Sequence, residues 1–97
     1  MGKTSISLIK PFATTGGEAA DKITSLILAD MTAGDYFDAA REAPEGASKA
    51  ELEARVCAKC ASVSFDVIRR LSMPDYAKLS AWYDAQWGLK ADGGPLP

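Results

Sequence analysis

The chain has 97 residues, of which 47% are hydrophobic and 25% charged, a composition typical of one small globular domain rather than of a disordered chain. Its 11 Lys and Arg residues against 13 Asp and Glu give a formal net charge of −2, which argues against a protein that binds nucleic acid through backbone phosphates. The absence of histidine excludes Ser-His and Cys-His nucleophilic pairs, histidine metal sites and an imidazole pH switch.

The N-terminal region has no long hydrophobic segment. Leu8 and Ile9 are the only consecutive apolar residues before Lys10, too few for a secretory signal. Elsewhere no run approaches the roughly 18 apolar residues of a membrane span. We therefore expect an intracellular protein without a membrane partner, in which the two cysteines are reduced.

Two extended segments open the chain and predict a β-hairpin. In residues 4–12 polar and apolar side chains begin by alternating, as in a half-buried strand, and Pro11 marks an edge position or the strand end. The connecting loop is expected at about residues 13–21, with a helical turn over residues 17–21 as the alternative. The second strand is expected over residues 22–31. Its apolar residues are Ile23, Leu26, Ile27 and Leu28.

The hydrophobic period changes from strand to helix after residue 31. Thr32-Ala33-Gly34-Asp35 has the spacing of a capping box with Asp at its fourth position, and the helix that it opens should end by Pro44. Tyr36, Phe37 and Ala40 form the short apolar face of this helix. Ser48-Lys49-Ala50-Glu51 is a complete capping box and predicts the start of a longer helix. The apolar stripe of that helix consists of Leu52, Val56, Cys60 and Val63.

Two more helices are predicted in the last third of the chain. A short helix covers residues 65–71, and Ser72-Met73-Pro74-Asp75 opens the last helix with Ser72 as N-cap and Pro74 in the first turn. Gly88 is a natural stop. The inner face of the last helix carries Tyr76, Leu79, Trp82, Tyr83 and Trp87.

The order of these elements predicts an α+β fold. We expect a single domain over residues 1–88, in which an N-terminal two-stranded antiparallel hairpin is followed by three to four helices, and a flexible C-terminal tail over residues 89–97. Because a two-stranded hairpin is marginal by itself in water, it must be covered by helices or extended by a partner's strand. The helices suffice for one face, so self-association through the hairpin edge is an expected mode of association.

Cys57-Ala58-Lys59-Cys60 is the motif closest to known chemistry. A C-x-x-C pair serves as a redox dithiol or as half of a zinc site. Its position in the middle of a helix and the lack of further Cys or His ligands favour core packing instead, with Cys60 in the core and Cys57 beside the apolar stripe. We expect no cofactor and no metal.

Other candidate sites also favour a protein that binds rather than catalyses. Asp35 and Asp38 are helical neighbours, but with no histidine and no phosphate loop a solvated acidic face is favoured over an acid/base pair. A helix-turn-helix, with Arg69 and Arg70 reaching DNA, is a further alternative that the net charge disfavours. The residues that we predict to contact a protein partner are Phe12, Ile27, Tyr83 and Trp87.

Read as a whole, residues 4–87 resemble the small tail assembly chaperones of Mu-like, contractile-tailed bacteriophages and related prophages. The order and spacing of five short motifs carry the resemblance, and Ser62-Val63-Ser64 departs from it where family members often have Gly. The motifs are Lys10-Pro11-Phe12, Thr32-Ala33-Gly34-Asp35, the small residues from Ala54 to Ala61, the Leu-x-x-x-Asp step from Leu71 to Asp75, and Trp82-Tyr83 near the end of the last helix.

This resemblance implies a non-enzymatic role in the host cytoplasm. Family members hold the aggregation-prone tape measure protein, help to recruit tail tube subunits, and generally do not remain in the finished virion. A small redox or metal protein, a DNA-binding regulator and a structural virion subunit are the alternatives.

Overall fold

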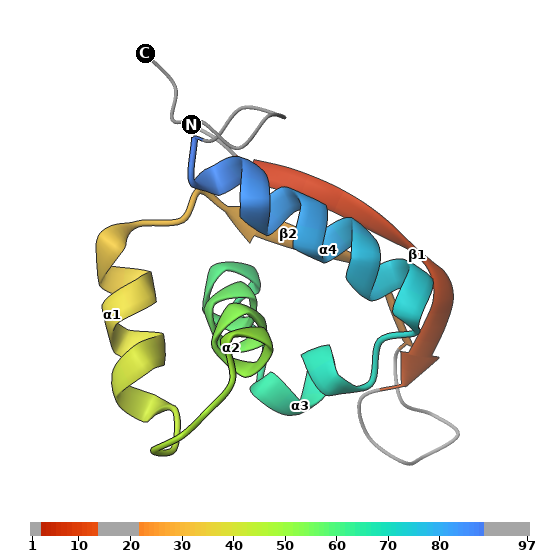
Figure 1. Ribbon diagram of the computed structural model, residues 1–97. Coiled ribbons are helices and arrows are strands. Elements are labelled where there is room, and N and C mark those ends of the chain that lie inside the picture. The colour runs from red at the N-terminus through yellow and green to blue at the C-terminus, as the bar shows by residue number, and fades with distance from the viewer. Residues whose placement is uncertain (1–2, 14–21, 89–97) are drawn as a thin grey trace.

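The computed structural model describes residues 3–13 and 22–88. The two strands form one antiparallel sheet, and the helices follow it in the chain (Figure 1). This is the predicted α+β fold, a hairpin followed by four helices. The elements are β1 (Lys3–Ala13), β2 (Lys22–Ala29), α1 (Ala33–Glu42), α2 (Lys49–Ala61), α3 (Phe65–Arg69) and α4 (Met73–Gln86). The predicted loop over residues 14–21 and the predicted tail lie outside the described residues.

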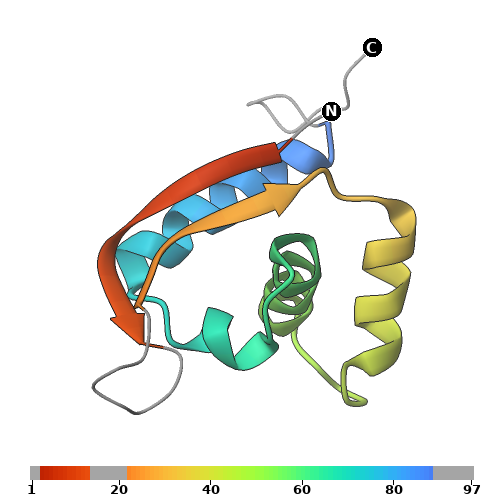
Figure 2. The ribbon, with the colours of Figure 1, turned by 180° about the vertical axis from the view of Figure 1, so that it is seen from behind.

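Alternation along the strands decides which face of the sheet is covered. Leucine and isoleucine side chains on one face are buried beneath α2 and α4, whereas the serines and the isoleucine between them point to the other face. None of the described helices lies over that second face (Figure 2). The buried residues are Ile6, Leu8, Leu26 and Leu28, and the exposed residues between them include Ser5, Ser7 and Ile27.

A carboxylate from α4 completes the irregular part of β1. The register of the hairpin shifts between Ser7 and Phe12. There the Asp75 side chain accepts hydrogen bonds from the backbone N–H groups of Ile9, at 2.7 Å, and Lys10, at 3.0 Å. Asp75 is only 1% exposed. The carboxylate therefore stands in for a strand partner and fixes α4 against β1.

The charged state of Asp75 is favoured by these bonds. Burial by itself raises the pKa of the carboxyl group, but the two backbone donors, the Ser72 hydroxyl and the Lys78 ammonium outweigh it and hold the pKa below its ordinary value. The Ser72 Oγ donates to Asp75 Oδ2 at 3.0 Å. Asp75 is thus a buried but well-satisfied carboxylate.

Two more side chains donate hydrogen bonds to backbone carbonyl oxygens of β1. The Lys78 ammonium donates to the Ser7 carbonyl oxygen at 3.0 Å, and Arg70 Nη1 donates to the Ala13 carbonyl oxygen at 3.0 Å. Because a free strand edge needs free N–H and C=O groups, β1 is a poor edge for self-association. The predicted association through a hairpin edge therefore stays a prediction for β2.

Hydroxyl side chains begin all four helices, three of them at the predicted positions Thr32, Ser48 and Ser72. The N-caps are Thr32, Ser48, Ser64 and Ser72. Both bonds of the capping box form at Thr32 and Asp35. The expectation of a complete box at Ser48 is wrong, because the Glu51 carboxylate pairs with Arg55 at 2.8 Å instead of turning back to the cap.

The end of α2 has a left-handed residue. Ser62 has φ 58°, and the Val63 N–H donates to the Ala58 carbonyl oxygen at 3.0 Å, as in a Schellman motif. A left-handed residue at this point of the chain is most easily glycine. Ser62 therefore holds a backbone conformation that glycine would adopt with less strain.

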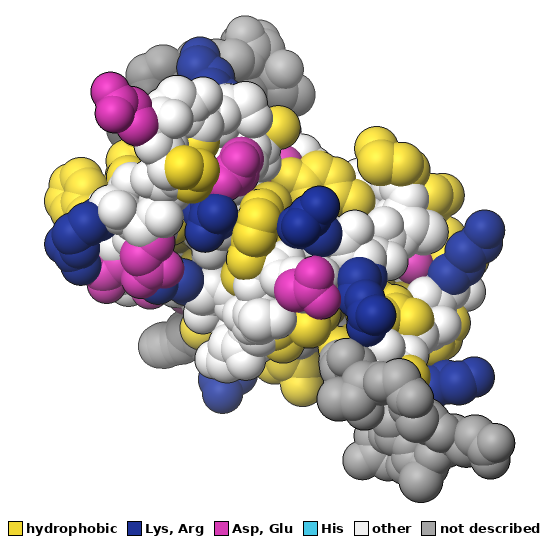
Figure 3. Space-filling model, turned by 90° about the horizontal axis from the view of Figure 1, so that it is seen from below, with side chains coloured by type: hydrophobic (Ala, Val, Ile, Leu, Met, Phe, Trp, Pro, Cys, Tyr) yellow, Lys and Arg dark blue, Asp and Glu magenta, His cyan; other side chains and the backbone are white. Residues whose placement is uncertain are grey.

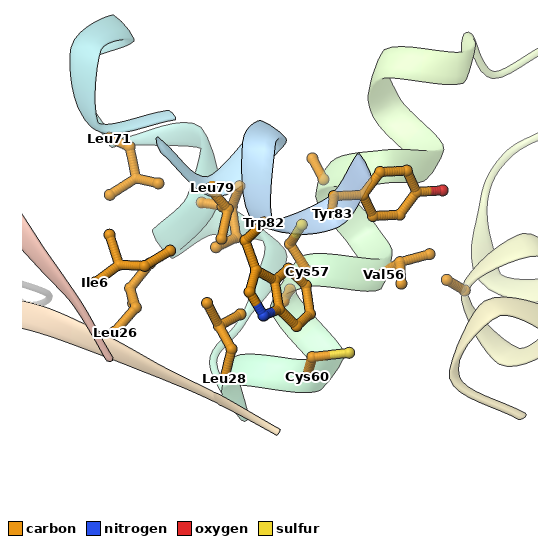
Figure 4. Packing of buried hydrophobic residues seen from close by; sticks show 14 of the residues in the cluster. Ile6, Leu26, Leu28, Val56, Cys57, Cys60, Leu71, Leu79, Trp82 and Tyr83 are labelled. Atoms are coloured by element: carbon orange, nitrogen blue, oxygen red, sulfur yellow. The ribbon is translucent and has the colours of Figure 1, made fainter. Parts of the chain in front are cut away.

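The core lies where the sheet, α2 and α4 meet. In Figure 4, Trp82 of α4 lies between Leu28 of the sheet and the α2 cysteines. Two sequence expectations need correction here. The strand β2 ends at Ala29 rather than at residue 31, because Met31 lies in the connection to α1. Cys57, expected beside the stripe, is fully buried, because α4 packs against that side of α2.

Candidate protein interaction surface

The start of α1 and the end of α4 bring four aromatic side chains together at the surface. We call these four residues, Tyr36, Phe37, Tyr83 and Trp87, the aromatic surface. The connection before α1 is tied to α4 by a hydrogen bond of 2.8 Å from the Met31 N–H to Gln86 Oε1. This bond fixes the two helices near the point where their aromatic side chains meet.

The four rings contact one another edge to face. Tyr36 and Trp87 have ring centroids 5.4 Å apart at an interplanar angle of 85°. Tyr83 and Trp87 are 6.0 Å apart, and Tyr36 and Phe37 are 5.9 Å apart. Such pairs contribute about 1 kcal/mol each beyond area burial, so they hold the rings in one arrangement before any partner binds.

Two hollows flank the Tyr36–Trp87 pair. One, of about 350 Å³, is bounded by α2 as well as by α1 and α4; it is lined by Tyr36, Lys49, Leu52, Glu53, Tyr83 and Trp87. The other, of about 360 Å³, is bounded by the connection before α1; it is lined by Met31, Thr32, Ala33, Tyr36, Phe37, Gln86 and Trp87. The lining offers apolar contact with few charged groups.

Exposure separates these aromatic residues into two pairs. Phe37 is 62% exposed and Trp87 is 47% exposed, whereas Tyr83 is buried and Tyr36 is half-buried. Burial also raises the pKa of the Tyr83 hydroxyl, so this group stays neutral at physiological pH. Large aromatic side chains that stay exposed above a supported base are typical of protein interfaces.

The structure groups two of the four predicted contact residues. Tyr83 and Trp87 belong to the aromatic surface. Ile27 is 56% exposed on the uncovered face of the sheet, and Phe12 is half-buried against the core, so neither lies in this cluster. Their role as contacts stays a prediction.

Sequence reasoning missed Tyr36 and Phe37 as contact residues, because both were assigned to one apolar helix face. Consecutive residues of a helix point about 100° apart, so two adjacent aromatic side chains cannot both face the same core. That signal was present in the sequence.

The two thiols have the properties of core residues. Cys57 and Cys60 are buried and unpaired in the structure, and their sulfur atoms point in different directions (Figure 4). Burial and the nearby Asp35 carboxylate raise the pKa of Cys60 to about 12, and burial together with Glu53 raises the pKa of Cys57 as well. Both are therefore thiols rather than reactive thiolates near neutral pH.

The remaining alternatives find little support in the described residues. Within residues 3–13 and 22–88 there is no group of three or more Cys, Asp or Glu side chains placed to hold a metal ion. No helix in this part of the chain has the length and hydropathy to cross a membrane. In the predicted helix-turn-helix, Arg69 is exposed, but Arg70 is engaged with Ala13 and Asp66.

Comparison with known families decides among these interpretations. Residues 5–85 match the family described as phage tail assembly chaperone proteins, E, or 41 or 14. The chain belongs to this chaperone family. The comparisons with curated proteins and with solved structures gave no match.

The fold explains three motifs of the tail assembly chaperone resemblance. The Leu-x-x-x-Asp step lies far from Lys10-Pro11-Phe12 in the sequence. In the fold, however, its Asp75 accepts a hydrogen bond from the Lys10 N–H. The Thr32-Ala33-Gly34-Asp35 motif is the complete capping box of α1, and its Asp35 also accepts the Cys60 thiol at 3.7 Å. These motifs therefore build the fold.

Proposed function

We propose that this tail assembly chaperone binds the tape measure protein and helps to recruit tail tube subunits in the host cytoplasm, by protein–protein contact without catalysis. The observation that carries the proposal is the aromatic surface. Phe37 and Trp87 keep about half of their area or more in contact with water although neighbouring rings support them. Exposed apolar area of this kind is favourable only when a partner covers it.

The hollows beside Tyr36 and Trp87 suit apolar side chains of a helical client. A hydrophobic helix offers anchors at three- and four-residue intervals, and each hollow has room for one large side chain. Several copies bound along one long client would shield much of its apolar surface with modest affinity per copy.

Co-expression with the tape measure protein of the same phage tests the proposal. The wild-type chain is expected to raise the soluble fraction of the client. Replacing both Phe37 and Trp87 with Ala should abolish this gain. Each aromatic anchor contributes about 2 kcal/mol or more, so the loss of one anchor alone lowers the affinity roughly 30-fold. Ile9→Ala is the matched control, because Ile9 is 58% exposed but lines neither hollow of the aromatic surface. Unchanged client solubility with the wild-type chain contradicts the proposal.

The remaining predicted contacts need their own variants. Ile27→Asp, on the uncovered sheet face, should weaken client binding if this face takes part in it. Phe12→Ala changes a half-buried residue, so its folding must be checked by circular dichroism before binding is compared. Mass spectrometry of mature particles separates an assembly chaperone, which is expected to be absent from them, from a structural subunit.

A further inference from the structure

A second apolar hollow lies away from the aromatic surface, between α2, α3 and the start of α4. Its volume is about 380 Å³. We call it the α3 groove. It is lined by Ala50, Glu51, Ala54, Phe65, Ile68, Arg69, Leu71, Met73 and Tyr76. The α2 helix separates the two regions, because Leu52 and Glu53 line a hollow of the aromatic surface, whereas Ala50 and Ala54 line the α3 groove.

The floor of the α3 groove is fixed and its rim is adaptable. Ile68 and Leu71 are buried and form part of the core, whereas Phe65 is half-buried and Met73 is 73% exposed. An exposed methionine beside an apolar hollow can adjust its shape to different partner side chains. The face that carries α3 shows hydrophobic side chains interspersed with both basic and acidic side chains (Figure 3).

The charges around the groove leave one cation uncompensated. Glu51, on the lining, pairs with Arg55 at 2.8 Å. That guanidinium also lies 4.2 Å from the centroid of the Phe65 ring. Arg69, also on the lining, has no hydrogen-bond or ion-pair partner among the residues that the structure describes.

The neighbouring charges do not cancel this positive charge. Asp66, on the same helix as Arg69, pairs with Arg70 at 3.8 Å. Asp75 is bonded inside the fold to β1, and the Tyr76 hydroxyl is bonded to Glu53. The lining of the α3 groove is therefore mainly apolar, and Arg69 is the cation on it that has no partner among the described residues.

We propose that the α3 groove binds an amphipathic helix of a second protein, in which an acidic side chain lies one turn from the apolar anchors. The apolar lining accepts the anchors and Arg69 meets the carboxylate. A small polar ligand fits less well, because the groups that could orient it are engaged with other residues. This docking surface is additional to the aromatic surface of the proposed function and does not depend on it.

A pair of charge-matched peptides tests the proposal on the full chain. One peptide is an amphipathic helix of about 15 residues made of Leu, Ala and Glu, and in the other Lys replaces every Glu. Chemical shifts of the chain are followed by NMR while each peptide is added. The Glu peptide should bind more tightly and shift the residues around Phe65 and Met73. High salt should weaken its binding.

Two variants decide the outcome. Arg69→Glu, at an exposed position, should weaken the Glu peptide roughly threefold to tenfold and reverse the preference in favour of the Lys peptide. Ile9→Ala, at an exposed residue that lines neither the α3 groove nor the hollows of the aromatic surface, should leave both affinities unchanged. Equal binding of the two peptides to the wild-type chain, an unreversed preference in Arg69→Glu, shifts centred on the aromatic surface, or no binding of either peptide would each overturn the proposal.

Discussion

The two ends of α4 differ in burial and in bonding. At its first turn, Asp75 is 1% exposed and accepts hydrogen bonds from β1 and from the Ser72 hydroxyl. At its C-cap, Trp87 is 47% exposed and contacts the half-buried Tyr36 ring and the buried Tyr83 ring. The first end of α4 is thus held by buried hydrogen bonds, whereas the other end keeps a large aromatic side chain exposed.

This difference has a physical cause. A buried carboxylate is tolerated only when its lone pairs are satisfied, so the Asp75 end cannot change partners without loss of stability. An exposed ring is held mainly by dispersion and loses little when a partner replaces water around it. The comparison teaches that the two ends of one helix can be held by different kinds of contact. It gives three tests of stability, and a fourth test concerns the end of α2.

The largest loss of stability is expected from a substitution at the buried first turn of α4. Asp75→Asn keeps the shape of the side chain, but its NH₂ group cannot accept the N–H of Ile9 or Lys10, and a buried donor is left unpaired. This variant should show the largest loss in free energy of unfolding, measured in urea. Trp87→Ala is the control at the other end and should lose much less. Equal losses at the two ends would contradict the comparison.

Acid should produce a similar loss of stability in the wild-type chain, because it protonates the Asp75 carboxylate. The folded-state pKa of Asp75 lies below its ordinary value of about 3.9, so its contribution is complete above that pH and is lost as pH falls through the folded-state pKa. The stability gap between the wild type and Asp75→Asn should therefore narrow only below about pH 4. Thermal unfolding of the wild type and of Asp75→Asn at several pH values from about 7 down to about 2 measures this gap. A gap that stays constant down to the lowest pH would show that the charge of Asp75 is unimportant.

The N-cap of α4 should contribute a smaller amount. Ser72→Ala removes the Oγ that accepts the Asp75 N–H and donates to its carboxylate, and should cost about 1 kcal/mol in urea unfolding. Ser72→Thr keeps the hydroxyl and serves as control. A loss as large for Thr as for Ala would mean that packing rather than the hydrogen bonds explains the effect.

The smallest expected effect is a gain in stability, from a substitution at the end of α2 rather than in α4. Ser62→Gly relieves the left-handed backbone at the end of α2 and should stabilise the chain by up to about 1 kcal/mol. Ser64→Gly is a matched control, because Ser64 has φ −75° and its Oγ accepts the Val67 N–H, so this change should not stabilise. Thermal unfolding of both variants separates backbone strain from a general effect of serine replacement.

Local signals in the sequence predict most of the fold. The strand alternation, the three predicted hydroxyl N-caps and Pro74 in the first turn of α4 depend on contacts within a few residues, and all are found in the structure. One error comes from a competing ion pair within the same helix, and the other comes from a distant element of the chain. Glu51 prefers Arg55 to its own cap, and Cys57 is buried because α4 covers it.

The candidate site was only partly predictable. Trp87 and Tyr83 were found from aromatic residues near a helix end, but their grouping with Tyr36 depends on how α1 docks beside α4. No periodic pattern gives that docking, because it depends on the angle between two helices separated by more than 30 residues, a distance in sequence that local propensity does not span.

The sequence by itself determined the element types, their order, the helix starts and the lack of histidine chemistry, because each follows from residue identity or from neighbours in the chain. Only the tertiary structure decided that Asp75 completes β1, that the aromatic side chains meet across α1 and α4, and that Arg69 lies on the lining of an apolar groove. Burial and pairing are properties of residues brought together from distant parts of the chain, and they exist only once the chain has folded.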